Sequence, residues 1–226
     1  MSTDTKQIAR KTYIRFLSGI PVLGLVFFLP AGTINYWEAW VYLIILFVPM
    51  FMVMQYLIKN DPALLERRMR MREKAAEQNL IIKISYVYFI VTYLIPGFDK
   101  RYGWSDAPLW LVVTAQVIVF LGYLLVTQVF KENSYASRTV EVDEDQKVID
   151  SGPYAVVRHP MYVGVGALYL LSPLALGSTW GLIPSALIIP LLATRIISEE
   201  KILAKELKGY SEYQQKVKYR LIPFIW

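Results

Sequence analysis

The feature that most constrains this chain is a series of apolar runs long enough to cross a lipid bilayer. A helix that rises about 1.5 Å per residue needs roughly 20 residues to span about 30 Å of hydrocarbon. Four stretches meet or approach that length: residues 16–34, 39–58, 80–98 and 108–130. Hydrophobic residues make up 55% of the 226 residues, which is typical of an integral membrane protein. We therefore expect an all-α integral membrane protein in which residues 1–226 form a single domain.

A fifth apolar block, residues 161–194, is too long for one span. Gly177 lies near its middle and Pro173, Pro184 and Pro190 lie inside it, which favours two short helices that form a hairpin. This gives six crossings, with five and a re-entrant segment as the alternative. We expect residues 1–130 to hold the N-terminal transmembrane helices and an amphipathic connector, and residues 131–226 to form a C-terminal region around the hairpin.

The distribution of charge predicts the orientation, because Lys and Arg concentrate in short loops on the cytoplasmic side. The segments predicted on the cytoplasmic side hold 22 of the 24 Lys and Arg residues: four in residues 1–15, seven in 59–83, four in 131–160 and seven in 195–226. The other two, Lys100 and Arg101, are predicted on the opposite side. Both termini are therefore expected in the cytoplasm. The net charge of +6 then reflects topology and anionic lipid rather than a nucleic-acid partner.

Two further observations narrow the class of protein. The first apolar run follows basic residues, as a signal peptide would, but its length and the second span close behind it favour a membrane helix. The chain has no cysteine, so disulfides, thiolate chemistry and cysteine-based zinc sites are excluded. We expect no metal site.

The connector between the second and third runs begins with Asp61-Pro62, which predicts a helix capped by Asp61 with Pro62 in its first position. Basic and apolar residues alternate in residues 64–74. A basic amphipathic helix that lies on the membrane surface is favoured here over a substrate-binding segment.

The polar residues around the hairpin are the candidates for chemistry, because ionisable side chains at the membrane boundary are costly unless paired or bound to a ligand. The segment reads Gly152-Pro153-Tyr154, three further residues, then Arg158-His159-Pro160-Met161-Tyr162, and includes the only histidine. Pro160 disfavours helix at His159, so a helix is expected to begin at Pro160. Its N-terminus, with Arg158 and His159, suits an anion such as a carboxylate or phosphate. The alternative is that Arg158 contacts lipid phosphate and His159 is a structural boundary residue.

Glu199 and Glu200 lie at the far end of the hairpin. Two carboxylates there suit vicinal hydroxyl groups, as acidic residues do for ribose in dinucleotide sites. Glu199 also has the spacing for a helical ion pair with Arg195, so Glu200 is the stronger candidate. Gly164 begins a short glycine pattern, for which close helix packing is favoured over ligand binding. Several tyrosines near the segment offer faces for stacking or for cation–π attraction to a sulfonium: Tyr154, Tyr162, Tyr169, Tyr210 and Tyr213.

Several segments together resemble the C-terminal half of the isoprenylcysteine carboxyl methyltransferase family, which is related to membrane phospholipid N-methyltransferases. They are Gly152-Pro153-Tyr154, Arg158 to Gly164, the pair Glu199-Glu200, and Tyr210, Tyr213 and Pro223. The resemblance covers residues 130–226. It implies S-adenosyl-L-methionine in a cytoplasm-facing pocket, and Arg158 as the residue closest to catalysis. The positions that it assigns to cofactor binding are Tyr154, Arg158, His159, Pro160, Tyr162, Gly164 and Glu200, with Glu199 as a further candidate.

The resemblance also implies a lipophilic or lipid-linked acceptor that enters from the bilayer. A carboxylate acceptor is ionised at neutral pH and needs no base, whereas an amine acceptor is expected to need one, for which His159 is the only imidazole. The membrane would be the inner membrane of a prokaryote or the endoplasmic reticulum of a eukaryote. Three alternatives remain open: a phospholipid N-methyltransferase, an NADPH-dependent reductase of the sterol type, and an inactive membrane scaffold. The residues Met161 to Val165 differ from the continuation expected of the reductases and favour methyl transfer.

Overall fold

The structure is a computed structural model that describes residues 3–69, 76–136, 142 and 145–226, without the side chains of residues 3–5 and 76–87. Every regular element in these residues is helical. The elements are α1 (Thr3–Ala31), α2 (Trp37–Asn60), α3 (Pro62–Met69), α4 (Ala76–Tyr102), α5 (Leu109–Glu132), a 3₁₀ turn η1 (Gly152–Ala155), α6 (Pro160–Ala175), α7 (Leu182–Ser185), α8 (Ile188–Glu206) and α9 (Tyr210–Lys216). The all-α membrane fold expected from the sequence is confirmed.

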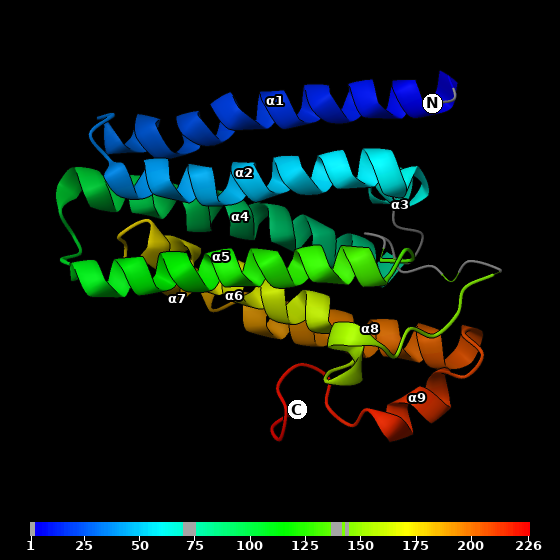
Figure 1. Cartoon of the computed structure of the whole chain (residues 1–226). Helices are drawn as coiled ribbons and strands as arrows, with labels where there is room; N and C mark the ends of the chain where they lie inside the picture. Colours follow the sequence, from blue (N-terminus) through cyan, green and yellow to red (C-terminus); the bar gives the residue numbers. More distant parts are fainter. Residues whose placement is uncertain (1–2, 70–75, 137–141, 143–144) are drawn as a thin grey trace.

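Successive long helices run in opposite directions, so that the connections between them gather at the two ends of the bundle (Figure 1). The N-terminus, α3, the loop after α5 and the end of α8 lie at one end, on the right in Figure 1. The turns that follow α1, α4 and α6 lie at the other end. The described parts of the segments that the charge distribution assigns to the cytoplasm thus lie largely at one end of the bundle, except for the C-terminal residues, which run back alongside α8. The side of the membrane that this end faces stays a prediction.

Four helical stretches among the described residues are long and apolar enough to cross a membrane: Lys6–Ala31, Trp37–Asn60, Leu109–Glu132 and Leu182–Glu206. Three of them correspond to the first, second and fourth predicted runs. The predicted run 80–98 forms part of α4, whose side chains are described from Tyr88 onward. The block 161–194 does fold as a hairpin, with the short apolar helix α6 as its first arm and α8 as its second. The total number of crossings stays a prediction.

The hairpin is fixed to the rest of the bundle where α5 and α6 meet, which is the most extensive helix pair of the protein. Gly122 of α5 and Gly164 of α6 face each other there. A Cβ atom on Gly164 would lie 2.5 Å from the carbonyl oxygen of Gly122 and 2.8 Å from Cγ2 of Val126. Small residues allow such close backbone approach between membrane helices. Gly164 is therefore a packing residue in this structure.

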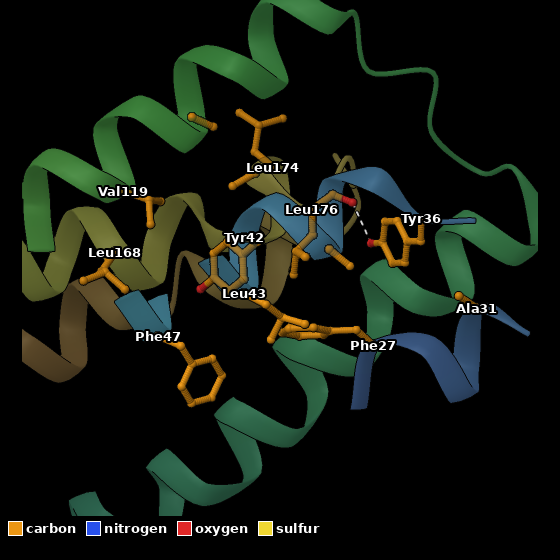
Figure 2. Close-up of a cluster of buried hydrophobic side chains, with 13 residues drawn as sticks. Phe27, Ala31, Tyr36, Tyr42, Leu43, Phe47, Val119, Leu168, Leu174 and Leu176 are labelled. Atoms are coloured by element: carbon orange, nitrogen blue, oxygen red, sulfur yellow. Dashed lines mark hydrogen bonds between the residues drawn. The ribbon is translucent and has the colours of Figure 1, made fainter. Parts of the chain in front are cut away.

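The principal core joins α1, α2, α5 and α6 near the end of the bundle opposite to α3, and includes Phe27, Tyr42, Val119 and Leu176. Figure 2 shows that these side chains converge from separate helices. The fully buried Tyr36 donates from its hydroxyl to the carbonyl oxygen of Leu176 at 2.6 Å, the bond drawn in Figure 2. A buried phenol needs such a partner. The turn after α6 is thereby attached to the start of α2.

The connector helix begins as predicted, because the side chain of Asp61 accepts a hydrogen bond from the backbone N–H of Leu64 at 2.9 Å. Its place on the membrane surface stays a prediction, but the apolar face of the described part packs on the protein. Leu64 and Leu65 are buried in a core with α2 and α5, and the guanidinium of Arg68 lies 4.3 Å from the ring centroid of Phe130. Residues 70–75 lie outside the described residues.

Candidate functional site

The segment with the Arg-His-Pro pattern is held by the C-terminal segment, residues 217–226. As expected, His159 is outside the helical region, with φ −124° and ψ 59°, and α6 begins at Pro160. The backbone N–H groups of Arg158 and His159 donate to the carbonyl oxygens of Tyr219 and Arg220, each at 2.9 Å. These two amide groups are therefore used within the protein, and the N–H groups of Tyr162 and Val163 in the first turn of α6 donate to the carbonyl oxygen of His159 at 3.0 and 3.3 Å.

Arg158 and Glu200 form the buried centre of the site. Nε of Arg158 donates to Oε1 of Glu200 at 2.7 Å, and each side chain is only 6% exposed. Nη1 of Arg158 donates to the carbonyl oxygens of Val217 and Lys218 at 2.8 and 2.9 Å. Buried charges persist only when they are paired and hydrogen-bonded in this way.

Glu200 also binds two further cationic or basic side chains. Oε2 accepts from Nε of Arg220 at 2.8 Å, and Oε1 lies 3.2 Å from Nε2 of His159. Both carboxylate oxygens are thus engaged by the protein. The prediction that Glu200 is the stronger candidate for binding ligand hydroxyls is not supported by this geometry, which makes Glu200 a connection between the motif and the C-terminal segment.

Glu199 faces the other way, because neighbouring residues on an α-helix point about 100° apart. Its Oε2 accepts from the hydroxyl of Tyr162 at 2.6 Å, and that hydroxyl accepts from Nε of Arg195 at 2.8 Å. The side chain of Glu199 is 22% exposed, against 6% for Glu200. Glu199 is therefore the carboxylate of the pair that a ligand can reach.

A cavity lies between the motif, α8, α9 and the loop that precedes η1. It contains about 820 Å³ of empty space, counting the part open to solvent. The charged side chains that line it, among the residues that the structure describes, are Lys147, Arg158, Arg195 and Glu199. Its other lining residues are Asn133, Tyr135, Ala136, Gln146, Val148, Ile149, Tyr154, His159, Met161, Tyr162, Leu203, Leu207, Tyr210 and Tyr213.

The tyrosines on the cavity wall differ in how their hydroxyl groups are used. Tyr154 accepts from Nδ2 of Asn133 at 2.8 Å, and its carbonyl oxygen accepts from the hydroxyl of Tyr213 at 2.8 Å. Burial raises the pKa of Tyr154 to about 12, so this phenol is neutral at physiological pH. The hydroxyl of Tyr210 is buried and has no hydrogen-bond partner among the described residues. An unpaired buried hydroxyl is costly, which makes Tyr210 a candidate ligand contact.

The structure thus brings most of the predicted site residues to one cavity. Tyr154, Arg158, His159, Tyr162 and Glu199 line it. Pro160, Gly164 and Glu200 do not. Pro160 starts α6, Gly164 contacts α5 and Glu200 is buried behind Arg158.

Other lining residues were not among the sequence candidates. Asn133 is the C-cap of α5, and Lys147 lies in the segment that precedes η1. Only the tertiary structure brings these two residues next to the motif. Tyr210 was noted only as one of several nearby aromatic residues, and no local signal distinguishes it from Tyr213.

Two comparisons with known proteins find similarities to this chain. Residues 110–209, which include the motif and both glutamates, match the family described as phospholipid methyltransferase. The solved structure of the eukaryotic intramembrane Ras methyltransferase, an isoprenylcysteine carboxyl methyltransferase, superposes with a TM-score of 0.50. The superposition covers 95% of this chain and 86% of that chain at 20% sequence identity. No curated protein matches the sequence significantly.

The family match covers residues 110–209, and the superposition shows that the chain has a fold similar to that of a membrane methyltransferase. Both findings support the resemblance seen in the sequence.

Proposed function

We propose that the cavity binds S-adenosyl-L-methionine and that the protein transfers the methyl group to a lipophilic acceptor from the bilayer, in the manner of carboxyl O-methylation. The observation that carries this proposal is the convergence of Arg158, Tyr162, Glu199 and Tyr210 on one cavity next to an apolar hairpin.

The lining residues fit this cofactor. Glu199 offers a partly exposed carboxylate for hydroxyl or ammonium groups, and Tyr210 offers a hydroxyl without a partner. The aromatic rings of Tyr154 and Tyr213 provide faces for an adenine or for a sulfonium cation. When bound, the cofactor supplies an activated methyl group on a positively charged sulfur.

The residues of the chain then hold the cofactor and the acceptor in position and exclude water, which are the main requirements for an in-line displacement. Arg158 holds its Nε and Nη1 against protein acceptors, and in the described structure its Nη2 has no such bond. This atom is available for a carboxylate of the cofactor or of the acceptor.

A phospholipid amine is the second candidate acceptor, because the family match is to phospholipid methyltransferases. An amine must lose a proton, and His159 is the only imidazole in the chain. Its Nε2 is held by Glu200, while Nδ1 lies 4.0 Å from Oε1 of Glu199. Methylation of an amine should therefore depend on His159 as a base, whereas methylation of a carboxylate should not.

Calorimetric titration of the purified protein with S-adenosylhomocysteine, and separately with NADPH, tests the cofactor. We expect Tyr210→Phe and Glu199→Gln to weaken binding of S-adenosylhomocysteine, each by about 5-fold to 100-fold, the range for loss of one hydrogen bond to a polar or charged group. Tyr219→Phe is the matched control, because Tyr219 contributes a backbone carbonyl but does not line the cavity. Binding of NADPH alone would indicate a reductase instead, and binding of neither compound would contradict the proposal.

A further inference from the structure

The tip of the C-terminal segment exposes a cluster of large apolar side chains. Phe224 is 88% exposed and Ile225 is 76% exposed, and Ile222 also projects outward. Phe224 has a φ of 67°, a conformation that bulky residues rarely adopt. The turn therefore keeps an aromatic side chain largely exposed, in contact with the ring of Tyr219 at a centroid distance of 5.3 Å, at a cost in backbone strain.

Part of the same segment is packed against the membrane hairpin. Leu221 and Trp226 contact the core cluster of Tyr88, Tyr162, Ile188, Leu192 and Ile196. The three α8 members of this cluster precede Glu200 by 4 to 12 residues, or about 6 to 18 Å along the helix axis. Figure 1 shows the segment running from α9 back alongside α8. The exposed tip is thus attached at a depth that belongs to the span Leu182–Glu206 rather than beyond its end.

Several backbone N–H groups of the tip are satisfied within the tip itself. Those of Arg220, Leu221 and Ile222 donate to the backbone oxygen of Trp226 at 2.8 to 3.2 Å. Those of Ile225 and Trp226 donate to the carbonyl oxygen of Ile222 at 3.1 Å, and Pro223 has no N–H. Such bonds lower the cost of bringing non-helical backbone to the edge of the hydrocarbon region, where each unsatisfied polar group costs several kcal/mol.

From these observations we propose that Ile222, Phe224 and Ile225 form a membrane anchor that inserts into the bilayer beside α8. The occupant of this surface is lipid acyl chain. The anchor also supports the site, because the carbonyl groups of residues 217–220 bind Arg158 and His159. This inference depends on the membrane location of α8 and not on the nature of the reaction.

Site-directed spin labelling tests the anchor, and the absence of native cysteine allows single labels to be placed directly. Nitroxides at Phe224→Cys and, in a second variant, Ile225→Cys are measured in phosphatidylcholine vesicles for collision with oxygen and with a water-soluble nickel chelate. Leu121→Cys serves as the lipid-facing standard, since Leu121 is exposed on the spanning helix α5, and Glu212→Cys on α9 serves as the water-facing standard. Circular dichroism verifies that each variant is folded.

We expect both tip labels to resemble Leu121→Cys, with high oxygen collision and nickel collision several-fold below that of Glu212→Cys. Nickel collision equal to that at Glu212→Cys would place the tip in water and overturn the proposal. Protection from both reagents together with dipolar broadening would show that a second copy of the chain covers the tip, which would also overturn it.

Discussion

The guanidinium of Arg158 and the carboxylate of Glu200 form a 2.7 Å hydrogen bond in which each side chain is only 6% exposed. The two residues are 42 positions apart in the chain, and Arg220 binds the same carboxylate from a third segment. The candidate site is therefore organised around a buried charge cluster, one member of which, Arg158, also lines the cavity.

Replacing Glu200 with Gln is expected to destabilise the protein by about 3 kcal/mol, because two arginines lose their only common anion. This value is the lower end of the range for breaking a buried ion pair. It applies because the side chain of Arg220 is 34% exposed, so that water compensates part of the lost interaction. Thermal unfolding in detergent measures this change. Glu199→Gln is the control: its side chain is partly exposed, and a loss of about 1 kcal/mol or less is expected. Equal effects of the two substitutions would contradict the structural role of Glu200.

Gly164→Ala is expected to weaken the contact between α5 and α6. The added Cβ would lie 2.5 Å from a backbone oxygen of Gly122, so the helices must separate at a cost of about 1–3 kcal/mol. Gly166→Ala, two residues later on the same helix, meets only the end of the Leu192 side chain at 3.3 Å. Its effect should be smaller and can be of either sign, since Ala is the better helix former by up to about 1 kcal/mol. Chemical unfolding compares the two, and a larger loss for Gly166→Ala would rule out the packing role of Gly164.

Asp99→Asn tests the end of the bundle opposite to the site. The buried Asp99 accepts from the backbone N–H and hydroxyl of Ser105 at 2.7 and 2.6 Å and from the hydroxyl of Ser178. Loss of these charge-assisted bonds should cost about 1.5–3 kcal/mol while affinity for S-adenosylhomocysteine is retained. The exposed Asp106 provides the control Asp106→Asn, with a change within about 0.5 kcal/mol. Loss of affinity in folded Asp99→Asn protein would show that the two ends are coupled.

Tyr36→Phe should leave the carbonyl oxygen of Leu176 without its 2.6 Å partner and lower stability by about 1–3 kcal/mol. Tyr102→Phe removes the hydroxyl of a tyrosine that is 60% exposed and should have little effect. Both variants are compared by their melting temperatures. An unchanged melting temperature for Tyr36→Phe would mean that the bond in Figure 2 contributes nothing to stability.

Local rules predicted the starts of helices well. Pro160 restricts the residue before it, and Asp61 caps a helix whose first residue is Pro62, so α6 and α3 begin where the sequence indicates. The apolar runs predicted α1, α2 and α5 because hydrocarbon thickness fixes the length of a spanning helix.

The sequence could not decide which of two adjacent glutamates faces the cavity, because that depends on the rotation of α8 against its neighbours. It favoured Glu200, since Glu199 has the spacing to pair with Arg195. In the structure, both Arg195 and Glu199 bind the hydroxyl of Tyr162 instead. The pairing of Arg158 with Tyr219 was equally hidden, because backbone bonds across 61 positions leave no local pattern.

The residues that complete the hydrogen bonding of Arg158 are synthesised after it, because they lie later in the chain. The ribosome delivers Arg158 and Glu200 to the membrane before it delivers residues 217–220, whose carbonyl groups complete their hydrogen bonding. The nascent protein must pass through a stage in which its spanning helices are inserted but this charge cluster lacks Arg220. A chain whose synthesis is interrupted before residue 217 would keep this incompletely paired charge cluster. Cellular quality control could use that difference to distinguish unfinished copies from finished ones.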